Sequence, residues 1–257
     1  MIRQASILLL LLGIGACTHS GAQPLPESLA RLDFLLLERP ASPLGDWLLV
    51  GCYEVTREEF GQPVDSSSAN LPVAMVSFEE ANTWSLARGL RLPTLKEWQY
   101  LASDSGRSAA VAASAHNGLP LNLERPLPVG VFERGRTSLG AYDFFGNVRE
   151  WVYEPSSDRY FACGGSFASR DASVSEWEQL ELLGSDRAED VGFRYVADAT
   201  GYFQAQVIPH WSSLSPEQRA DLALILERWN PQSRAALVAR LEVLNAPQDF
   251  CQLLKGS

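Results

Sequence analysis

The sequence predicts an α+β fold that is irregular and rich in loops, followed by a helical extension at the C-terminus. Three observations support this prediction. Between residues 46 and 198, short apolar segments alternate with capped helix starts and glycine-containing turns. Within this region, residues 103–127 show no strong period and are expected to form a loop. In residues 199–257, leucines and tryptophans instead recur at helical spacing.

Composition excludes several classes of protein. Of the 257 residues, 46% are hydrophobic and 20% are charged, which is typical of a folded domain and not of a disordered chain. The formal net charge is −10, from 21 basic and 31 acidic residues, and no basic run interrupts this balance. Nucleic acids and anionic lipid surfaces attract cationic proteins, so neither is an expected partner.

Residues 1–16 have the form of a bacterial lipoprotein signal peptide. Arg3 precedes an apolar run at 7–14, which is shorter than the roughly 20 apolar residues needed to span a bilayer. The sequence Ile-Gly-Ala-Cys that ends at Cys17 resembles the lipobox of such proteins. We therefore expect Cys17 to be lipidated, the alternative being an ordinary secretory signal. Thr18 is not the Asp that resembles an inner-membrane retention signal, which favours the outer membrane, facing the periplasm.

Residues 17–45 are predicted to connect this anchor to the folded domain. Small polar residues and prolines at 18–26 suit a tether. Leucines recur through residues 27–38 and predict a short amphipathic helix, which would end at Pro40.

The domain at 46–198 begins with a predicted strand and two predicted helices. Residues 47–55 are rich in apolar and aromatic side chains that alternate loosely, which favours a strand. Ser77 and Glu80 have the spacing of a capping box, so a helix is expected to begin directly after Ser77. Thr94 and Glu97 form a second capping box and predict the next helix.

The extension at 199–257 is predicted to be a helical hairpin. Ser215 precedes a proline at the first helical position, and Gln218 stands at the third, which is a typical helix start. A second start is expected at Asn230. The apolar stripes of the two helices favour docking on the domain or on a partner; their members are Leu222, Ile225, Leu226, Trp229, Leu237, Leu241 and Leu244.

A series of short motifs also occurs in a fixed order between residues 46 and 197: Tyr53-Glu54-Val55-Thr56, Arg91-Leu92-Pro93-Thr94, Pro128-Val129-Gly130, Gly140-Ala141-Tyr142-Asp143, Gly146-Asn147-Val148-Arg149-Glu150-Trp151, Gly164-Gly165-Ser166-Phe167 and Gly192-Phe193-Arg194. In this order they resemble the formylglycine-generating enzyme family, also called sulfatase-modifying factor domains. The resemblance implies a fold similar to that of C-type lectins.

The resemblance also implies a copper chemistry for which this chain lacks the ligands. Enzymes of the family oxidise a sulfatase cysteine with molecular oxygen, and two cysteines hold their Cu(I). Soft thiolates suit this ion. At the implied positions the chain has Ser169 and Val174, and neither can act as a thiolate. We therefore expect no bound copper and favour a non-catalytic domain, although this does not decide whether the chain is an enzyme.

The remaining cysteines and the histidines leave few substitutes for this site. Cys52 and Cys163 could form a disulfide, remain as buried thiols, or hold copper after a rearrangement of the loop. A second branch of the family that the chain resembles uses iron held by clustered histidines. Here His19, His116 and His210 are far apart and have no ligand spacing, so such iron is not expected.

Calcium is the cofactor that the resemblance supports best. Members of the family often bind Ca²⁺ around the Gly-Asn-x-x-Glu-Trp motif. The corresponding ligands here are the carbonyl groups of Phe145, Gly146 and Val148 and the side chain of Glu150. The alternative is that Glu150 pairs with an arginine. Arg194 is itself expected to form an internal salt bridge, because a buried charge must be paired.

These observations favour a membrane-tethered, non-catalytic protein of the cell envelope that acts as a binding or scaffold component. Its partner is expected to be an envelope protein or a glycan, because long loops suit recognition. The alternative function is that of an oxidoreductase or protein-modifying enzyme of the formylglycine-generating type, with a displaced cysteine or another cofactor.

Overall fold

The computed structural model describes the chain over residues 34–38, 47–102, 125–131, 136–137, 139–169 and 179–256. The predicted signal peptide at 1–16, the lipidation site Cys17 and the tether at 18–26 lie outside the described residues. Among the helices that are described, none combines the length and the apolar character needed to cross a membrane.

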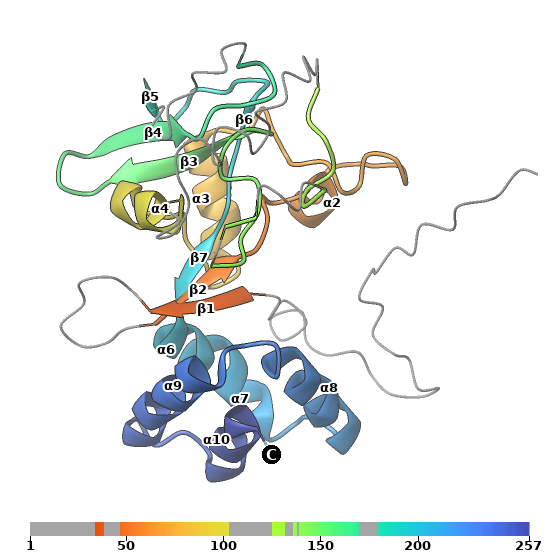
Figure 1. Cartoon of the computed structure of the whole chain (residues 1–257), viewed down its shortest axis with the longest axis vertical. Coiled ribbons are helices and arrows are strands. Elements are labelled where there is room, and N and C mark those ends of the chain that lie inside the picture. Colours follow the sequence, from red (N-terminus) through yellow and green to blue (C-terminus); the bar gives the residue numbers. More distant parts are fainter. Residues whose placement is uncertain are drawn as a thin grey trace, which may run out of the picture.

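Two small sheets form the framework of the domain (Figure 1). The first has the order β1-β2-β7 and is antiparallel, with strands β1 (Phe34–Glu38), β2 (Trp47–Gly51) and β7 (Val196–Asp198). The second has the order β5-β4-β3-β6, with strands β3 (Arg149–Glu154), β4 (Arg159–Cys163), β5 (Gln179–Leu182) and β6 (Val191–Gly192). Only β3 and β6 pair in parallel within this sheet.

The prediction of a helix over residues 27–38 is wrong for residues 34–38, the part of this segment that the structure describes. Residues 34–38 form strand β1, which pairs with β2 from Phe34 opposite Gly51 to Glu38 opposite Trp47. The physical reason is that both faces of this strand are covered. Phe34 and Leu36 belong to one core cluster, whereas Leu35 packs against the other. A strand buried on both faces has a continuous apolar run, and such a run is indistinguishable from a buried helix by its period.

Three helices, α2 (Arg57–Phe60), α3 (Phe78–Leu86) and α4 (Leu95–Ala102), complete the described part of the domain. Both predicted capping boxes are present. The backbone N–H of Glu80 donates to Ser77 Oγ at 3.2 Å, and Ser77 N–H donates to the Glu80 carboxylate at 2.9 Å. Thr94 and Glu97 make the same exchange at 3.2 and 3.0 Å. Each box satisfies helix donors that would otherwise lack a partner.

The prediction of a C-terminal helical extension is confirmed, but the extension is larger than a hairpin. Its helical segments are α6 (Ala199–Tyr202), a π-helical turn (Phe203–Val207), α7 (Ile208–Trp211), α8 (Pro216–Leu226), α9 (Pro231–Val243) and α10 (Gln248–Lys255). The predicted helix start at Ser215 and Gln218 is present as a capping box. Pro209 has no N–H to donate to the preceding turn, which accounts for a π-helical turn directly before it.

The extension packs on the domain through a shared core. In Figure 1 its helices cover one side of the β1-β2-β7 sheet, and the rest of the domain lies on the other side. Phe34 and Leu49 of this sheet belong to the same buried cluster as Phe203 and Leu237 of the extension. The indole N–H of Trp229 also donates to the Phe34 carbonyl at 2.6 Å. Of the two predicted docking surfaces, the domain is the one that the structure supports.

Candidate functional site

A fully buried ion pair lies at the centre of the domain. Glu150 is on β3, and Arg194 follows β6, the parallel neighbour of β3. Arg194 Nη2 lies 2.7 Å from Glu150 Oε1, and both side chains are 0% exposed. Arg194 Nε and the indole N–H of Trp98 both donate to Glu150 Oε2, at 3.2 and 2.8 Å. The predicted internal salt bridge of Arg194 is therefore confirmed, with Glu150 as its partner.

The guanidinium of Arg194 also joins two separate parts of the backbone. It donates to the carbonyl of Gly51 at 2.9 Å and to the carbonyl of Tyr142 at 2.6 Å. Its charged carbon lies 4.2 Å from the centre of the Phe144 ring. Burial lowers the pKa of Arg194, but Glu150 outweighs this effect, and the pKa is raised overall. The arrangement is that of a structural cross-link with every contact internal.

A second buried carboxylate, Glu54, organises the turn before β3. Glu54 accepts hydrogen bonds from the side-chain amide of Asn147 at 2.7 Å and from the backbone N–H of Val148 at 3.0 Å. Asn147 in turn exchanges hydrogen bonds with the backbone of Leu127, at 3.0 and 3.2 Å. Burial, reinforced by the charges of Asp143 and Glu150, raises the pKa of Glu54 well above its usual value. This favours the neutral carboxyl.

Asp143 is the third buried carboxylate of this region. It accepts a hydrogen bond from the backbone N–H of Gly130 at 2.6 Å. Burial raises the pKa of Asp143 to about 6, although the Gly130 N–H and the charge of Arg194 oppose the shift. Burial and the negative charges of neighbouring carboxylates therefore outweigh the nearby guanidinium and raise the pKa values of Glu54 and Asp143.

The Glu150 carboxylate, one of the predicted calcium ligands, already has other partners. The carboxylate of Glu150 already accepts hydrogen bonds from Trp98 and Arg194, and the guanidinium would lie beside any bound cation. Its side chain therefore fits the alternative, pairing with an arginine, and does not fit a calcium ligand. The carbonyl groups of Phe145, Gly146 and Val148 as calcium ligands stay a prediction. Among the described residues, no three His, Cys, Asp or Glu side chains form a metal-binding group.

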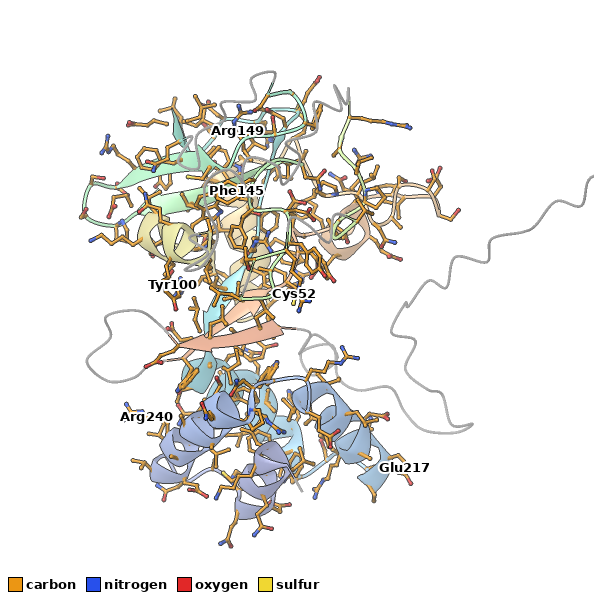
Figure 2. All side chains as sticks on the ribbon, in the orientation of Figure 1. Cys52, Tyr100, Phe145, Arg149, Glu217 and Arg240 are labelled. Carbon is orange, nitrogen blue, oxygen red and sulfur yellow. The ribbon has the colours of Figure 1, made fainter. Side chains whose placement is uncertain are left out.

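The first position at which the resemblance implies a copper thiol is part of a compact polar cluster. Ser169 Oγ accepts hydrogen bonds from the backbone N–H of Ser166 at 3.0 Å and from Arg149 Nη2 at 3.2 Å. Arg149 also contacts Ser166 Oγ, and it forms a short ion pair with Asp190. The Ser166 hydroxyl donates to Asp190 at 2.6 Å. Figure 2 shows Arg149 at the end of the domain remote from the extension.

The cluster is well shielded from solvent, because the side chains of Arg149 and Asp190 are 13% and 17% exposed. The second implied thiol position, Val174, lies outside the described residues. The cluster therefore places a hydroxyl, a guanidinium and a carboxylate where the resemblance implies soft metal ligands.

Of the alternatives left open for Cys163, the structure shows a buried free thiol. Cys163 ends β4 opposite Glu150 and packs in the core cluster that contains Trp98 and Phe144. Burial, with a smaller effect of the Glu150 charge, raises the pKa of Cys163 to about 12. Cys52 directly follows β2 and is partly exposed, and its carbonyl accepts from the Tyr142 N–H at 2.9 Å (Figure 2). The buried position of Cys163 within this packing explains why it remains a thiol.

The histidines do not add a metal site to the described region. His210 lies in α7 and is exposed, and its carbonyl accepts from the hydroxyl of Ser213 at 2.7 Å and from the Ser213 N–H at 3.0 Å. His19 and His116 lie outside the described residues. Cys251 is buried in α10 within the extension.

Sequence reasoning missed the roles of Glu54, Arg149, Ser166 and Asp190. Glu54 and Ser166 stand inside motifs that were recognised, but a motif does not show which polar atoms meet. Arg149 and Asp190 come together because β3 and β6 are parallel neighbours, although 41 positions separate the two residues in the chain. A charged residue beside a strand of buried aromatics is the one signal that could have marked them for pairing.

Comparison with known proteins finds relatives for the region that contains this site. Residues 46–199 match a family described as the sulfatase-modifying factor enzyme 1-like domain. Hercynine oxygenase of Mycobacterium tuberculosis is 34% identical over 109 residues, which cover 39% of this chain and 25% of that protein. Hercynine oxygenase of Mycolicibacterium thermoresistibile is 32% identical over 114 residues, covering 39% of this chain and 24% of that protein. The chain thus spans about a quarter of the length of these relatives.

Among solved structures, Treponema denticola variable protein 1 is similar with a TM-score of 0.48 and 18% identity. The match covers 63% of this chain and 91% of that protein.

Proposed function

The chain belongs to the sulfatase-modifying factor enzyme 1-like domain family, and we propose that it is a non-catalytic member that acts as a binding or scaffold component of the cell envelope. Its partner in this proposal is an envelope protein or a glycan. A lipid on Cys17 would hold it at the outer membrane, facing the periplasm, as the sequence of residues 1–17 favours.

The observation that carries the proposal is the state of Ser169. A serine hydroxyl has two acceptor lone pairs. Here one accepts from the Ser166 N–H at 3.0 Å, and the other accepts from Arg149 Nη2 at 3.2 Å. Neither lone pair is left for a metal ion, and a hydroxyl is in any case a poor ligand for Cu(I). The guanidinium of Arg149, fixed by Asp190, also closes the side from which an ion would approach.

Cys163 is a poor substitute for the missing thiolates. It is 0% exposed, and its pKa of about 12 leaves roughly one molecule in 10⁵ ionised at pH 7. The thiolate is the form that binds metals, so a site at Cys163 would need a rearrangement of the core. This supports the non-catalytic proposal over an enzyme with a displaced cysteine.

A binding role also suits the way in which the extension is attached. The core shared by the domain and the extension fixes the surface of the extension relative to the loops of the domain. A partner could therefore contact both parts without the entropic cost of ordering a linker. No catalytic group is needed for such a role.

Metal loading of the full-length chain tests the proposal. The chain is purified in detergent, treated anaerobically with Cu(I), passed through a desalting column and analysed for copper. We expect far less than one copper per chain, and the same low value for Cys163→Ser. A double variant, Ser169→Cys with Val174→Cys, serves as the matched control, because it restores the two thiols that the family resemblance implies.

The opposite result would favour the alternative function. One copper per chain in the wild type, lost in Cys163→Ser and accompanied by oxygen consumption, would support an oxidoreductase or protein-modifying enzyme with a displaced cysteine. The curated relatives carry the name oxygenase, so oxygen consumption is measured in parallel.

A further inference from the structure

The helical extension contains a buried arginine that has no partner among the described residues. Arg234 lies one turn into α9 and is 7% exposed. Its Nε and Nη1 atoms are shielded from solvent and make no hydrogen bond. The side chain takes part in none of the ion pairs that the described residues form. Its backbone N–H donates to the Asn230 carbonyl at 3.0 Å.

The contrast with Arg194 shows how unusual this is within the same molecule. Arg194 is also buried, and its guanidinium contacts the Glu150 carboxylate and two carbonyl groups. Transfer of an unpaired charge from water to a protein interior costs several kcal/mol, so buried arginines are almost always paired. Arg234 therefore lacks a component that its burial requires.

The acidic residues on the neighbouring helices do not supply that component. Glu242 is the one acid of α9, and it pairs with Lys255 at 2.8 Å. Asp249 is the one acid of α10, and it accepts from Trp211 at 2.9 Å and pairs with Arg219 at 3.1 Å. Both carboxylates are committed to other cations or donors.

The guanidinium of Arg234 lies close against the backbone of Gly256. Gly256 ends α10 with φ 82°, and a Cβ added there would lie 3.1 Å from Arg234 Nη1 and 3.2 Å from Nη2. A side chain at this position would crowd the guanidinium and would also strain the backbone. Glycine therefore permits the close approach of both terminal nitrogens to this turn.

We infer that Arg234 and the turn at Gly256 form an oxyanion-binding site, which takes a carboxylate or a phosphate group. The guanidinium offers hydrogen-bond donors in a planar fork that matches these two groups. The group could come from a ligand in solution or from a carboxylate carried by the chain itself. The two sources share the same chemistry, and the experiment separates them. The inference does not depend on the proposed function.

The test measures thermal unfolding of the full-length chain as inorganic phosphate replaces chloride at constant ionic strength. A ligand that binds only the folded state raises the midpoint as its concentration rises. We expect the wild-type midpoint to rise with phosphate and the Arg234→Met midpoint to remain constant. Arg240→Met is the matched control, because Arg240 lies on the same helix but is exposed (Figure 2), and it should respond as the wild type does.

Two further proteins make the result decisive. Arg234→Lys retains the charge but not the planar fork, so its response to phosphate should be weaker than that of the wild type. A chain with two residues added after Ser257 tests whether a carboxylate of the chain itself is the ligand. If phosphate stabilises this extended chain but not the wild type, and Arg234→Met abolishes the effect, the chain's own carboxylate is the ligand.

The inference is overturned if Arg234→Met and Arg240→Met respond to phosphate to the same extent in both chain lengths. Loss of folding in Arg234→Met is not expected, because an apolar side chain of similar volume usually replaces a buried charge without loss of stability.

Discussion

Removal of Arg194 should destabilise the protein more than removal of any exposed arginine. Arg194→Met would leave Glu150 without its cation and the carbonyl groups of Gly51 and Tyr142 without a donor. Breaking a buried ion pair by removal of one partner costs about 3–5 kcal/mol, because the other charge remains buried and unpaired. We expect a loss of this size in the free energy of unfolding at pH 7.

Urea unfolding followed by tryptophan fluorescence measures this loss, provided that the slope of the transition is the same in both proteins. The matched control is Arg187→Met, which removes an ion pair with Glu80 of similar length, 2.8 Å, between side chains that are 50% and 43% exposed. Solvent screens an exposed pair, so the control should lose much less. A loss in Arg194→Met no larger than that in Arg187→Met would refute the structural role of the buried pair.

A double-mutant cycle assigns the loss to the pair itself. Glu150→Gln keeps an acceptor for the Trp98 indole but removes the negative charge. The double variant Glu150→Gln with Arg194→Met should lose less stability than the sum of the two single losses, by about 1–3 kcal/mol. Strict additivity would show that the two side chains do not depend on each other.

Of three further predictions, two rest on the structure and the third rests on the sequence around Cys17. Burial raises the pKa of Asp143 from 3.8 to about 6, so protonation of Asp143 stabilises the fold as the pH falls through 6, and this contribution is lost as the pH rises again. Asp143→Asn should therefore reduce the gain in the free energy of unfolding between pH 7 and pH 4 by about 2–3 kcal/mol. An unchanged pH profile in this variant would contradict the shift. EDTA should leave the midpoint of urea unfolding unchanged, because Trp98 and Arg194 already use the Glu150 carboxylate; a midpoint that falls with EDTA and recovers with Ca²⁺ would show that the predicted carbonyl set holds an ion. Cys17→Ser should move the chain from the membrane fraction to the soluble fraction, because it removes the predicted site of the lipid, and stable anchoring requires more than one acyl chain. A variant that still sediments with membranes would contradict lipid anchoring.

Local signals in the sequence predicted the helix starts but not every strand. The capping boxes at Ser77, Thr94 and Ser215 involve residues three positions apart, so their spacing alone defines the hydrogen bonds. The apolar run of strand β1 predicts a helix, because core residues pack on both faces of the strand and leave no alternation in its sequence. One of these faces packs against the extension that begins at residue 199. The strand character of β1 depends on packing that is remote in sequence.

The candidate site shows the same limit more strongly. The pairing of Arg194 with an acid followed from the cost of a buried charge, and the structure supplies Glu150. The cluster around Ser169 could not be predicted in this way. Arg149 and Asp190 meet through a parallel strand pair, and the register of such a pair is set by the whole fold. The buried carboxylates Glu54 and Asp143 have raised pKa values for a similar reason, because burial is a property of the folded chain.

The most direct test of the non-catalytic proposal is oxygen consumption by the full-length chain after Cu(I) loading, with a cysteine-containing sulfatase peptide as the substrate. Since both lone pairs of Ser169 Oγ are occupied, we predict a rate equal to that of a protein-free copper blank and a peptide whose mass does not change. Sustained oxygen uptake with conversion of the peptide cysteine to formylglycine would contradict the proposal.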